Sequence, residues 1–198
     1  MSATNLIPLP RPMRADARRN FERLLNAANA AFAERGAETC LEDVAESAGV
    51  GIGTLYRHFP TRRALAEAVY RDQIEALVAL ANDLLDSPSP DEALATWLRA
   101  VVQHSLTKRG LAEFFQTVMR EEGSDLTWCR EVMRSAGAAL LARAQQDGTV
   151  RPDVDIAALL RLTHAVAAAA GNGSDGVNPA NRLLSIVIDG LRRQELSK

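Results

Sequence analysis

Apolar residues recur at intervals of three and four positions along most of this chain, which is the spacing that places them on one face of an α-helix. Between residues 15 and 34, for example, Phe21, Leu24, Ala28 and Phe32 share one predicted face. The alternation of apolar and polar residues that is typical of β-strands forms no convincing stretch. Alanine, the best helix former, occurs 34 times against 12 glycines. The sequence therefore predicts an all-α fold.

Glycine and proline residues divide this helical pattern into segments, because both disfavour the interior of a helix. Residues 1–13 contain three prolines and no periodicity, so they are predicted to form a flexible basic arm. About nine helices follow, with predicted ranges of 15–34, 41–48, 52–59, 62–85, 91–108, 111–122, 125–147, 153–171 and 179–195.

The composition excludes several classes of protein. With 47% hydrophobic and 24% charged residues, the chain can bury a core and is not a disordered tail. Its longest apolar runs, such as residues 165–170, are far shorter than a membrane span, so no membrane contact is predicted. Two cysteines, Cys40 and Cys129, are too few for a disulfide scaffold. Since residues 1–20 lack the apolar core of a signal peptide, we expect a cytoplasmic protein.

Two short predicted helices, 41–48 and 52–59, are joined by a tight turn at Gly49, where a left-handed backbone is needed to reverse the chain. Thr39 is predicted to cap the first of them, with Glu42 completing a capping box. Helices joined in this way form a helix-turn-helix, which in DNA-binding proteins places its second helix in the major groove.

The second of these helices and the start of the next one carry side chains suited to phosphate oxygens and base edges. Arg62 and Arg63 follow the predicted helix cap Thr61, in a first turn where the helix dipole disfavours cations by about 0.3–1 kcal/mol. Their position is favourable when a phosphate lies opposite the start of the helix. The alternative is that the two arginines are exposed to solvent and have no binding role. The other polar side chains of this stretch are Thr54, Tyr56, Arg57 and His58.

The distribution of charge matters more than its sum. A formal net charge of −2 for the whole chain speaks against a strongly basic nucleic-acid binder. The first 23 residues nevertheless carry five arginines against Asp16 and Glu22. Two roles stay open for this N-terminal segment of 23 residues. Its arginines contact phosphates or a minor groove, or it is a solvated tail. Because the cations gather around the helix-turn-helix, the net charge limits nonspecific affinity rather than excluding DNA binding.

The stretch Glu42–Arg62 resembles the TetR/AcrR family of transcriptional regulators. The resemblance is carried by the turn Ala48–Val50, by the Gly-Thr-Leu-Tyr-x-His-Phe helix at 53–59 and by the Thr-Arg pair at 61–62. It implies a DNA-binding domain over residues 14–60 and a ligand-binding and dimerisation domain over 61–198. It also implies phosphate contacts from Tyr56, His58 and Arg62. The full set of expected DNA contacts is Thr39, Gly51, Ile52, Gly53, Thr54, Tyr56, Arg57, His58, Thr61 and Arg62.

The chain departs from the family pattern at the start of the recognition helix. Gly51 stands where serine often caps this helix, and Ile52 stands where a polar or basic residue is frequent. With Gly53 following, few polar side chains remain for hydrogen bonds to bases, while the backbone can approach DNA closely. We therefore expect contact of Ile52 or Thr54 with thymine methyl groups, and groove shape, to carry part of the sequence preference.

The C-terminal half combines bulky apolar residues with a few polar groups, which is the usual lining of a small-molecule site. Since the same residues can simply pack a core, that alternative stays open for each of them. The candidate pocket residues are Trp97, Val101, His104, Phe115, Met119, Trp128 and Met133.

The last predicted helices have more apolar surface than one core-facing stripe requires. Two such helices from each subunit would form a symmetric four-helix interface, and the alternative is a bundle within one chain. The candidate residues of a homodimer interface are Leu162, Val166, Leu184, Ile188 and Leu191.

Neither catalysis nor a cofactor is predicted. The three histidines have no cysteine or carboxylate partners at metal-ligand spacing, and the sequence contains neither a phosphate loop nor a nucleophile elbow. Two other functions stay open, namely a helical module controlled by a partner protein and a small enzyme built around His104 and Glu113. The favoured function is a homodimeric repressor that an unknown small-molecule effector releases from a palindromic double-stranded DNA operator.

Overall fold

A computed structural model of the chain describes residues 15–107, 126–170 and 177–193. Within these ranges the regular elements are helices, apart from an isolated bridge between Val150 and Arg192, which confirms the predicted all-α fold. The predicted arm at 1–13 and the predicted helix at 111–122 lie outside the described residues. The helices are α1 (Ala15–Arg35), the 3₁₀ turn η1 (Gly36–Glu38), α2 (Leu41–Ser47), α3 (Ile52–His58), α4 (Arg62–Leu84), α5 (Pro90–Thr107), α7 (Leu126–Gln146), α8 (Ile156–Ala169) and α9 (Val177–Leu191).

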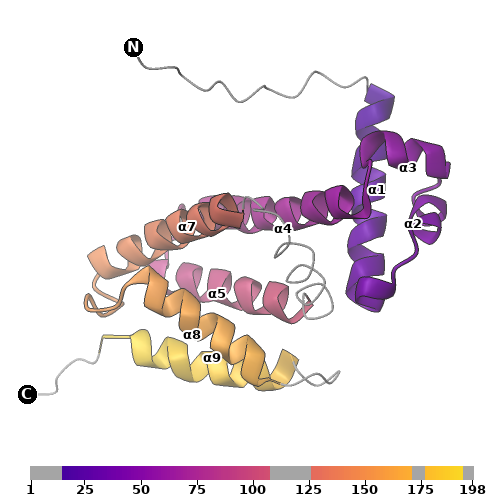
Figure 1. Cartoon of the computed structure of the whole chain (residues 1–198). Coiled ribbons are helices and arrows are strands. Elements are labelled where there is room, and N and C mark those ends of the chain that lie inside the picture. Colours follow the sequence, from indigo (N-terminus) through magenta and orange to yellow (C-terminus); the bar gives the residue numbers. More distant parts are fainter. Residues whose placement is uncertain (1–14, 108–125, 171–176, 194–198) are drawn as a thin grey trace, which may run out of the picture.

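The helices form two groups that share α4 (Figure 1). α1, α2 and α3 gather at one end of the molecule, and α4 runs from that end along α5 and α7. α8 and α9 pack on α5, on the side away from α4. α4 is therefore the long element that connects the helix-turn-helix to the C-terminal bundle.

Each group has its own hydrophobic core. The first core joins α1, α2 and α3 to the first half of α4, and its fully buried members include Leu24, Leu55 and Leu65. The second core joins the second half of α4 to α5, α7, α8 and α9, and its largest fully buried side chain is Trp97. The packing of the first core thus continues beyond residue 60, the predicted end of the DNA-binding domain, as far as Val69.

Several helix ends follow the predicted local signals. Gly36 and Gly49 have φ angles of +53° and +62°, so α1 and α2 end at the left-handed glycines that the sequence predicts. Thr61 caps α4 as predicted, because its hydroxyl accepts a hydrogen bond of 3.0 Å from the backbone N–H of Ala64. These ends fix where the short helices α2 and α3 start and stop.

The predicted cap of α2 by Thr39 is wrong. The turn η1 places Thr39 one residue before the N-cap position, which Cys40 occupies without a side-chain cap hydrogen bond. The Thr39 hydroxyl is buried instead, 3.0 Å from the carbonyl oxygen of Ala31 and 2.9 Å from that of Gly36. The capping box is also absent, because the Glu42 carboxylate accepts a hydrogen bond of 2.9 Å from the Cys40 thiol.

α7 approaches α5 closely at the buried Gly137. A Cβ atom at this position would lie 2.7 Å from the Trp97 ring and from Cδ1 of Ile156. Trp97 cannot easily move, because it is fully buried and its Nε1–H donates a hydrogen bond of 3.0 Å to the Leu77 carbonyl. We expect Gly137→Ala to lower the free energy of unfolding by about 1–3 kcal/mol, the usual cost of overpacking a core.

Urea denaturation followed by circular dichroism measures this effect. The matched control is Gly53→Ala, where the added methyl group meets no atom within 4 Å. Unchanged stability of Gly137→Ala would mean that Trp97 and Ile156 can move apart without loss of packing.

Candidate nucleic-acid interface

α3 is anchored by one face and open on the other. Its first backbone hydrogen bonds run to the carbonyl of Gly51, and its Leu55 side chain is fully buried. Phe59, the residue after the helix, is 3% exposed and packs in the same core. Because these anchors point inward, the opposite face of α3 is directed outward. The exposed residues there are Gly51, Ile52, Gly53, Tyr56 and Arg57, while Thr54 and His58 are half-buried.

The outward face of α3 combines apolar and polar groups. Ile52 and Tyr56 lie one helical turn apart and leave 36% and 45% of their surface exposed. Arg57 adds a guanidinium beside them. A branched aliphatic group, a phenol and a guanidinium can contact thymine methyl groups, phosphates and base edges. The face therefore has the chemistry that DNA recognition requires.

The two glycines of this face have no packing role within the chain. A Cβ atom at Gly51 or at Gly53 would meet no atom within 4 Å. Gly53 lies inside α3, where glycine is less stable than alanine by about 0.5–1 kcal/mol, whereas Gly51 is the N-cap of α3, a position that glycine favours over alanine. The described structure therefore leaves open space in front of both positions, through which another molecule can approach the α3 backbone closely.

The turn before α3 is held from α1. The Arg23 guanidinium donates a hydrogen bond of 3.3 Å to the Gly49 carbonyl and occupies the space into which a side chain at Gly49 would project. The two residues are 26 positions apart, so no local pattern in the sequence marks Arg23 for this contact. Arg23 is therefore a residue of the interface that the sequence prediction did not single out.

His58 lies at the C-terminal end of α3 among aromatic rings. Its ring centre is 6.0 Å from that of Phe21 on α1 and 6.2 Å from that of Phe59. Phe21 and Phe59 also contact each other, with ring centres 5.1 Å apart. This packing fixes the imidazole at the edge of the first core and leaves it half-exposed, close in sequence to the exposed Tyr56. Both residues of the predicted phosphate pair are thus accessible.

The cations at the start of α4 have partners within the chain. The Arg62 guanidinium lies 5.8 Å from the centre of the Phe32 ring, and the Arg62 side chain is half-buried. Nε of Arg63 is 2.7 Å from the Glu67 carboxylate, one turn further along the helix. These partners offset the unfavourable position of two arginines in a first turn, so neither a phosphate nor a fully solvated pair, the two alternatives that the sequence left open, is needed to account for it.

Of the residues predicted to contact DNA, only Thr39 is withdrawn from the surface. It is 1% exposed, and its hydroxyl is engaged with backbone carbonyls of the same domain. The other nine are exposed or half-buried and lie on α3, on its N-cap or at the start of α4. Thr39 therefore has a structural role.

The neighbouring helix α2 faces solvent with acidic residues. Glu42 and Glu46 are both exposed. The hydrogen bond from the Cys40 thiol holds the pKa of Glu42 below its usual value, which favours the ionised carboxylate. The negative side of the helix-turn-helix is thus α2, and the side that suits a polyanion is the α3 face with Arg23 and Arg57.

The predicted pocket residues fall into three groups. Trp97, Val101 and Met133 are buried in the second core. His104 and Trp128 are half-buried, at the C-terminal end of α5 and in the first turn of α7. Phe115 and Met119 lie outside the described residues. Core packing therefore accounts for the first three, and the two half-buried residues are the described candidates for contact with a ligand.

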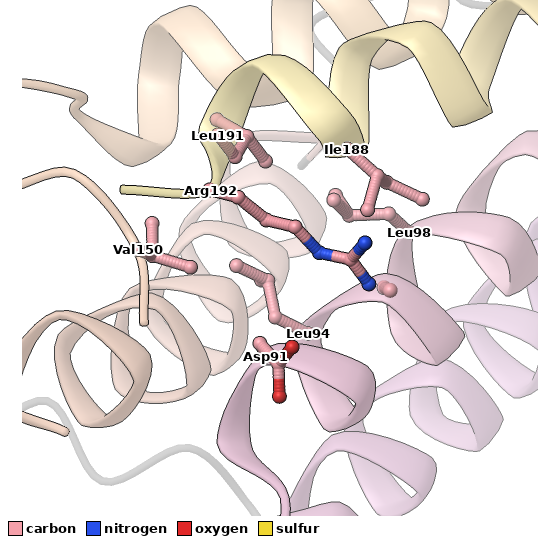
Figure 2. Close-up of a pocket in the computed structure, with 8 residues that line it drawn as sticks. Asp91, Leu94, Leu98, Val150, Ile188, Leu191 and Arg192 are labelled. Atoms are coloured by element: carbon pink, nitrogen blue, oxygen red, sulfur yellow. The ribbon is translucent and has the colours of Figure 1, made fainter. Parts of the chain in front are cut away.

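A small cavity lies elsewhere in the bundle, between α5, α9 and the loop after α7 (Figure 2). Leu94, Leu98, Val150 and Ile188 give it an apolar lining, and Arg192 and Asp91 stand at its edge. Its volume of about 10 Å³ is close to the space that one water molecule needs. The cavity is therefore too small for an organic effector.

Four of the five predicted dimer residues lie on the inward faces of their helices. Val166, Leu184, Ile188 and Leu191 are buried in the chain's own core, with 8% exposure or less. Leu162 is exposed as an interface residue should be, at 48%. Leu183 and Ile186 of α9 are also large, apolar and exposed, and neither is among the five predicted interface residues.

Two further kinds of site are absent from the described parts of the chain. No helix there combines the length and the apolar character that crossing a bilayer demands. In the same ranges, no three histidine, cysteine or acidic side chains converge as metal ligands would. Glu113, the carboxylate of the alternative enzyme site with His104, lies outside the described residues.

Comparisons with known proteins agree with this geometry. Residues 24–69 match the family model described as bacterial regulatory proteins of the tetR family. Residues 89–193 match the model described as the C-terminal domain of SbtR-like transcriptional regulators. The chain is 30% identical over 181 residues to the HTH-type transcriptional repressor KstR2 of Rhodococcus jostii, an alignment that covers 85% of this chain and 89% of that protein.

Solved structures show the same architecture. A TetR transcriptional regulator from Streptomyces coelicolor has 36% identity and a TM-score of 0.79, over 88% of this chain and 99% of that one. A TetR regulatory protein from Mycobacterium vanbaalenii has 35% identity and a TM-score of 0.73, over 92% of this chain and 100% of that one. Together with the exposed recognition face of α3, these matches show that the chain is a DNA-binding transcriptional regulator that belongs to the TetR family.

Proposed function

We propose that the chain acts as a homodimeric repressor, which binds a palindromic operator and leaves it when a small molecule binds its C-terminal domain. Each subunit places α3 in a major groove, and the half-sites lie about one turn of DNA, ~34–36 Å, apart. The observation that carries the proposal is the face of α3, anchored by Leu55 with Ile52 and Tyr56 exposed. The KstR2 relative is named a repressor, which supports repression rather than activation.

The proposed contacts are of two kinds: contacts with phosphates, which position the domain on the DNA, and contacts with bases, which recognise the sequence. Tyr56, Arg57 and His58 bind phosphates near the C-terminal end of α3, together with the exposed Thr61. Ile52 reaches the bases, along with Gly51, Gly53 and Thr54, because these residues form the N-terminal end of a helix whose opposite face is buried. The Arg62 guanidinium lies 5.8 Å from the centre of the Phe32 ring, so we assign Arg62 a supporting role in phosphate binding.

The proposed dimer interface is the exposed apolar surface of α8 and α9. Leu162, Leu183 and Ile186 are 48%, 38% and 70% exposed, and α8 and α9 lie side by side (Figure 1). Leu183 and Ile186 are neighbours on the surface of α9, since they lie three positions apart, and adjacent exposed apolar side chains mark contact surfaces. A second copy of the chain suits this surface, since two helices from each subunit form a four-helix contact around a two-fold axis.

The proposed organisation follows the same boundaries as the sequence prediction. Residues 1–13 form an arm, residues 14–60 bind DNA and residues 61–198 bind the effector and dimerise. The first half of α4 packs with the DNA-binding part, as far as Val69. We place the effector, a small organic molecule, beside the half-buried His104 and Trp128 between α5 and α7.

Selection of bound duplexes from a random DNA pool tests this function. The expected product is a palindrome with two half-sites about one helical turn apart. A selected site without two-fold symmetry would contradict the dimeric arrangement. Failure to enrich any sequence would contradict specific DNA binding.

Arg57→Gln is expected to weaken operator binding by about 10-fold and to reduce the dependence of log K on log salt concentration by about one per subunit, because one phosphate contact is lost. Fluorescence anisotropy titrations at several salt concentrations measure both quantities. Arg99→Gln, a change of an exposed arginine on α5, is the control. An unchanged salt dependence for Arg57→Gln would show that this guanidinium does not contact a phosphate.

A further inference from the structure

α4 belongs to both hydrophobic cores, and the change from one to the other occurs at a single residue. Leu65 and Val69 pack with α1, α2 and α3, whereas Ile74 and Leu77 pack with the C-terminal helices. Tyr70 packs against both cores. Since α4 is one continuous helix from Arg62 to Leu84, a rotation of α4 at Tyr70 carries the DNA-binding helices with it.

The residues at this changeover are held by the C-terminal helices. The ring centre of Tyr70 is 6.4 Å from that of His104, at the end of α5. Burial raises the pKa of Tyr70 to about 12, so its phenol stays neutral in the core. The next residue, Arg71, holds its guanidinium 4.8 Å from the centre of the Trp128 ring, in the first turn of α7. A guanidinium over an indole ring is attracted by the electron density of the ring.

The same part of α4 is fastened to the DNA-binding helices. The Gln73 side-chain amide donates a hydrogen bond to Asn29 of α1, and Arg62 lies over Phe32 of the same helix. The first half of α4 and α1 are thus linked on both sides of Tyr70. Along α4, the contacts of Tyr70 with α5 and of Arg71 with α7 therefore lie nearest to the DNA-binding helices, ahead of the packing of Ile74 and Leu77.

We propose that Tyr70 and Arg71 are positioning residues, through which α5 and α7 set the orientation of the DNA-binding domain, and that the Arg71–Trp128 pair is held more firmly when the operator is bound. The inference rests on the proposed DNA-binding role of α3. A domain that is not held in one orientation must be ordered when both subunits dock on their half-sites, and this ordering weakens binding. A ligand near His104 or Trp128 acts on DNA binding through the same two residues.

The first test measures operator affinity for the full chain and for Arg71→Met, Trp128→Leu and the double variant. Each single change is expected to raise the dissociation constant at least about 5-fold, the lower end of coupling between linked sites. The dissociation constant of the double variant is expected to be no higher than that of the single variant with the larger effect, because both substitutions remove the same contact. Arg71→Lys keeps the cation and is expected to restore part of the affinity.

The second test uses the tryptophans as built-in reporters. The chain has two, and Trp97 is fully buried, so quenching of the emission by acrylamide reports on the half-buried Trp128. Operator DNA is expected to lower this quenching in the wild-type chain and to leave it unchanged in Arg71→Met. Arg99→Met, which removes an exposed arginine of α5, is the control and is expected to behave as the wild type.

The outcomes separate this inference from the proposed function. Variants that bind the operator as the wild type does, or whose effects on affinity are additive, would overturn the role of Arg71 and Trp128 and leave the proposed function intact. Operator binding by the wild type without any change in Trp128 quenching would do the same. A wild-type chain that binds no operator would overturn both.

Discussion

The Gly53→Leu variant is expected to fold as stably as the wild-type chain and to bind the operator about 100-fold more weakly, because a new side chain would stand between α3 and the DNA. The folded chain has room for it, since a Cβ atom at Gly53 meets no atom within 4 Å. Glycine in a helix is also less stable than leucine or alanine. The change therefore separates DNA contact from stability.

Gly53→Ala sets the scale of the effect. One methyl group in a well-packed contact costs about 1–3 kcal/mol at most sites, which corresponds to a loss of affinity of about 10-fold or more. The same methyl group is expected to stabilise the free protein by up to about 1 kcal/mol. Effects of opposite sign on folding and on binding are not expected from general damage to the domain.

Anisotropy titration with the selected operator measures the affinities, and thermal unfolding measures stability. Ala142→Leu adds a side chain of the same size to an exposed position on α7 and is expected to bind as the wild type does. Wild-type affinity of Gly53→Leu would mean that the DNA does not approach α3 at this position. The proposed docking of α3 in the groove would then be wrong.

The elements that were predicted correctly depend on local signals. Gly36 and Gly49 end helices because a left-handed residue is needed there, and Thr61 caps α4 because its side chain lies beside the first free N–H groups. Thr39 is also a residue type that caps helices, but the turn η1 places it one residue before the N-cap position of α2. Its hydroxyl donates to the carbonyls of Ala31 and Gly36 instead. A short 3₁₀ turn of this kind leaves no distinct pattern in the sequence.

The dimer residues show a second limit of sequence patterns. α9 is apolar on two faces, and periodicity does not show which face the chain covers itself. Leu184 and Ile188 pack against the second core, while Leu183 and Ile186 face outward. The choice depends on where α5 and α8 lie, and only the folded structure supplies that.

Contacts between distant residues were also beyond prediction. Arg23 reaches the Gly49 carbonyl from α1, and Arg71 stacks on Trp128 from α4. In each case the sequence shows an arginine on a helix, without a pattern that names its partner. The recognition helix was predictable because its residues lie within one short segment, whereas the residues that orient it come from three separate helices.

Ile186→Asp is expected to convert the protein from a dimer to a folded monomer and to lower operator affinity by about 10²–10⁴-fold. Ile186 is 70% exposed, so the new carboxylate is solvated in the monomer and does not disturb the core. In the dimer the same carboxylate would be buried without a partner, which is strongly unfavourable. Without dimerisation each subunit binds its half-site alone, and the gain from two linked binding events is lost.

Sedimentation velocity at micromolar concentration measures the change in mass, and anisotropy titration with the selected palindrome measures the change in affinity. Ala142→Asp places the same charge on an exposed position of α7 and is expected to leave both quantities unchanged. A dimeric Ile186→Asp would show that the interface lies elsewhere. A monomeric variant that binds the palindrome as tightly as the wild type would show that dimerisation through α9 is not what aligns the two recognition helices.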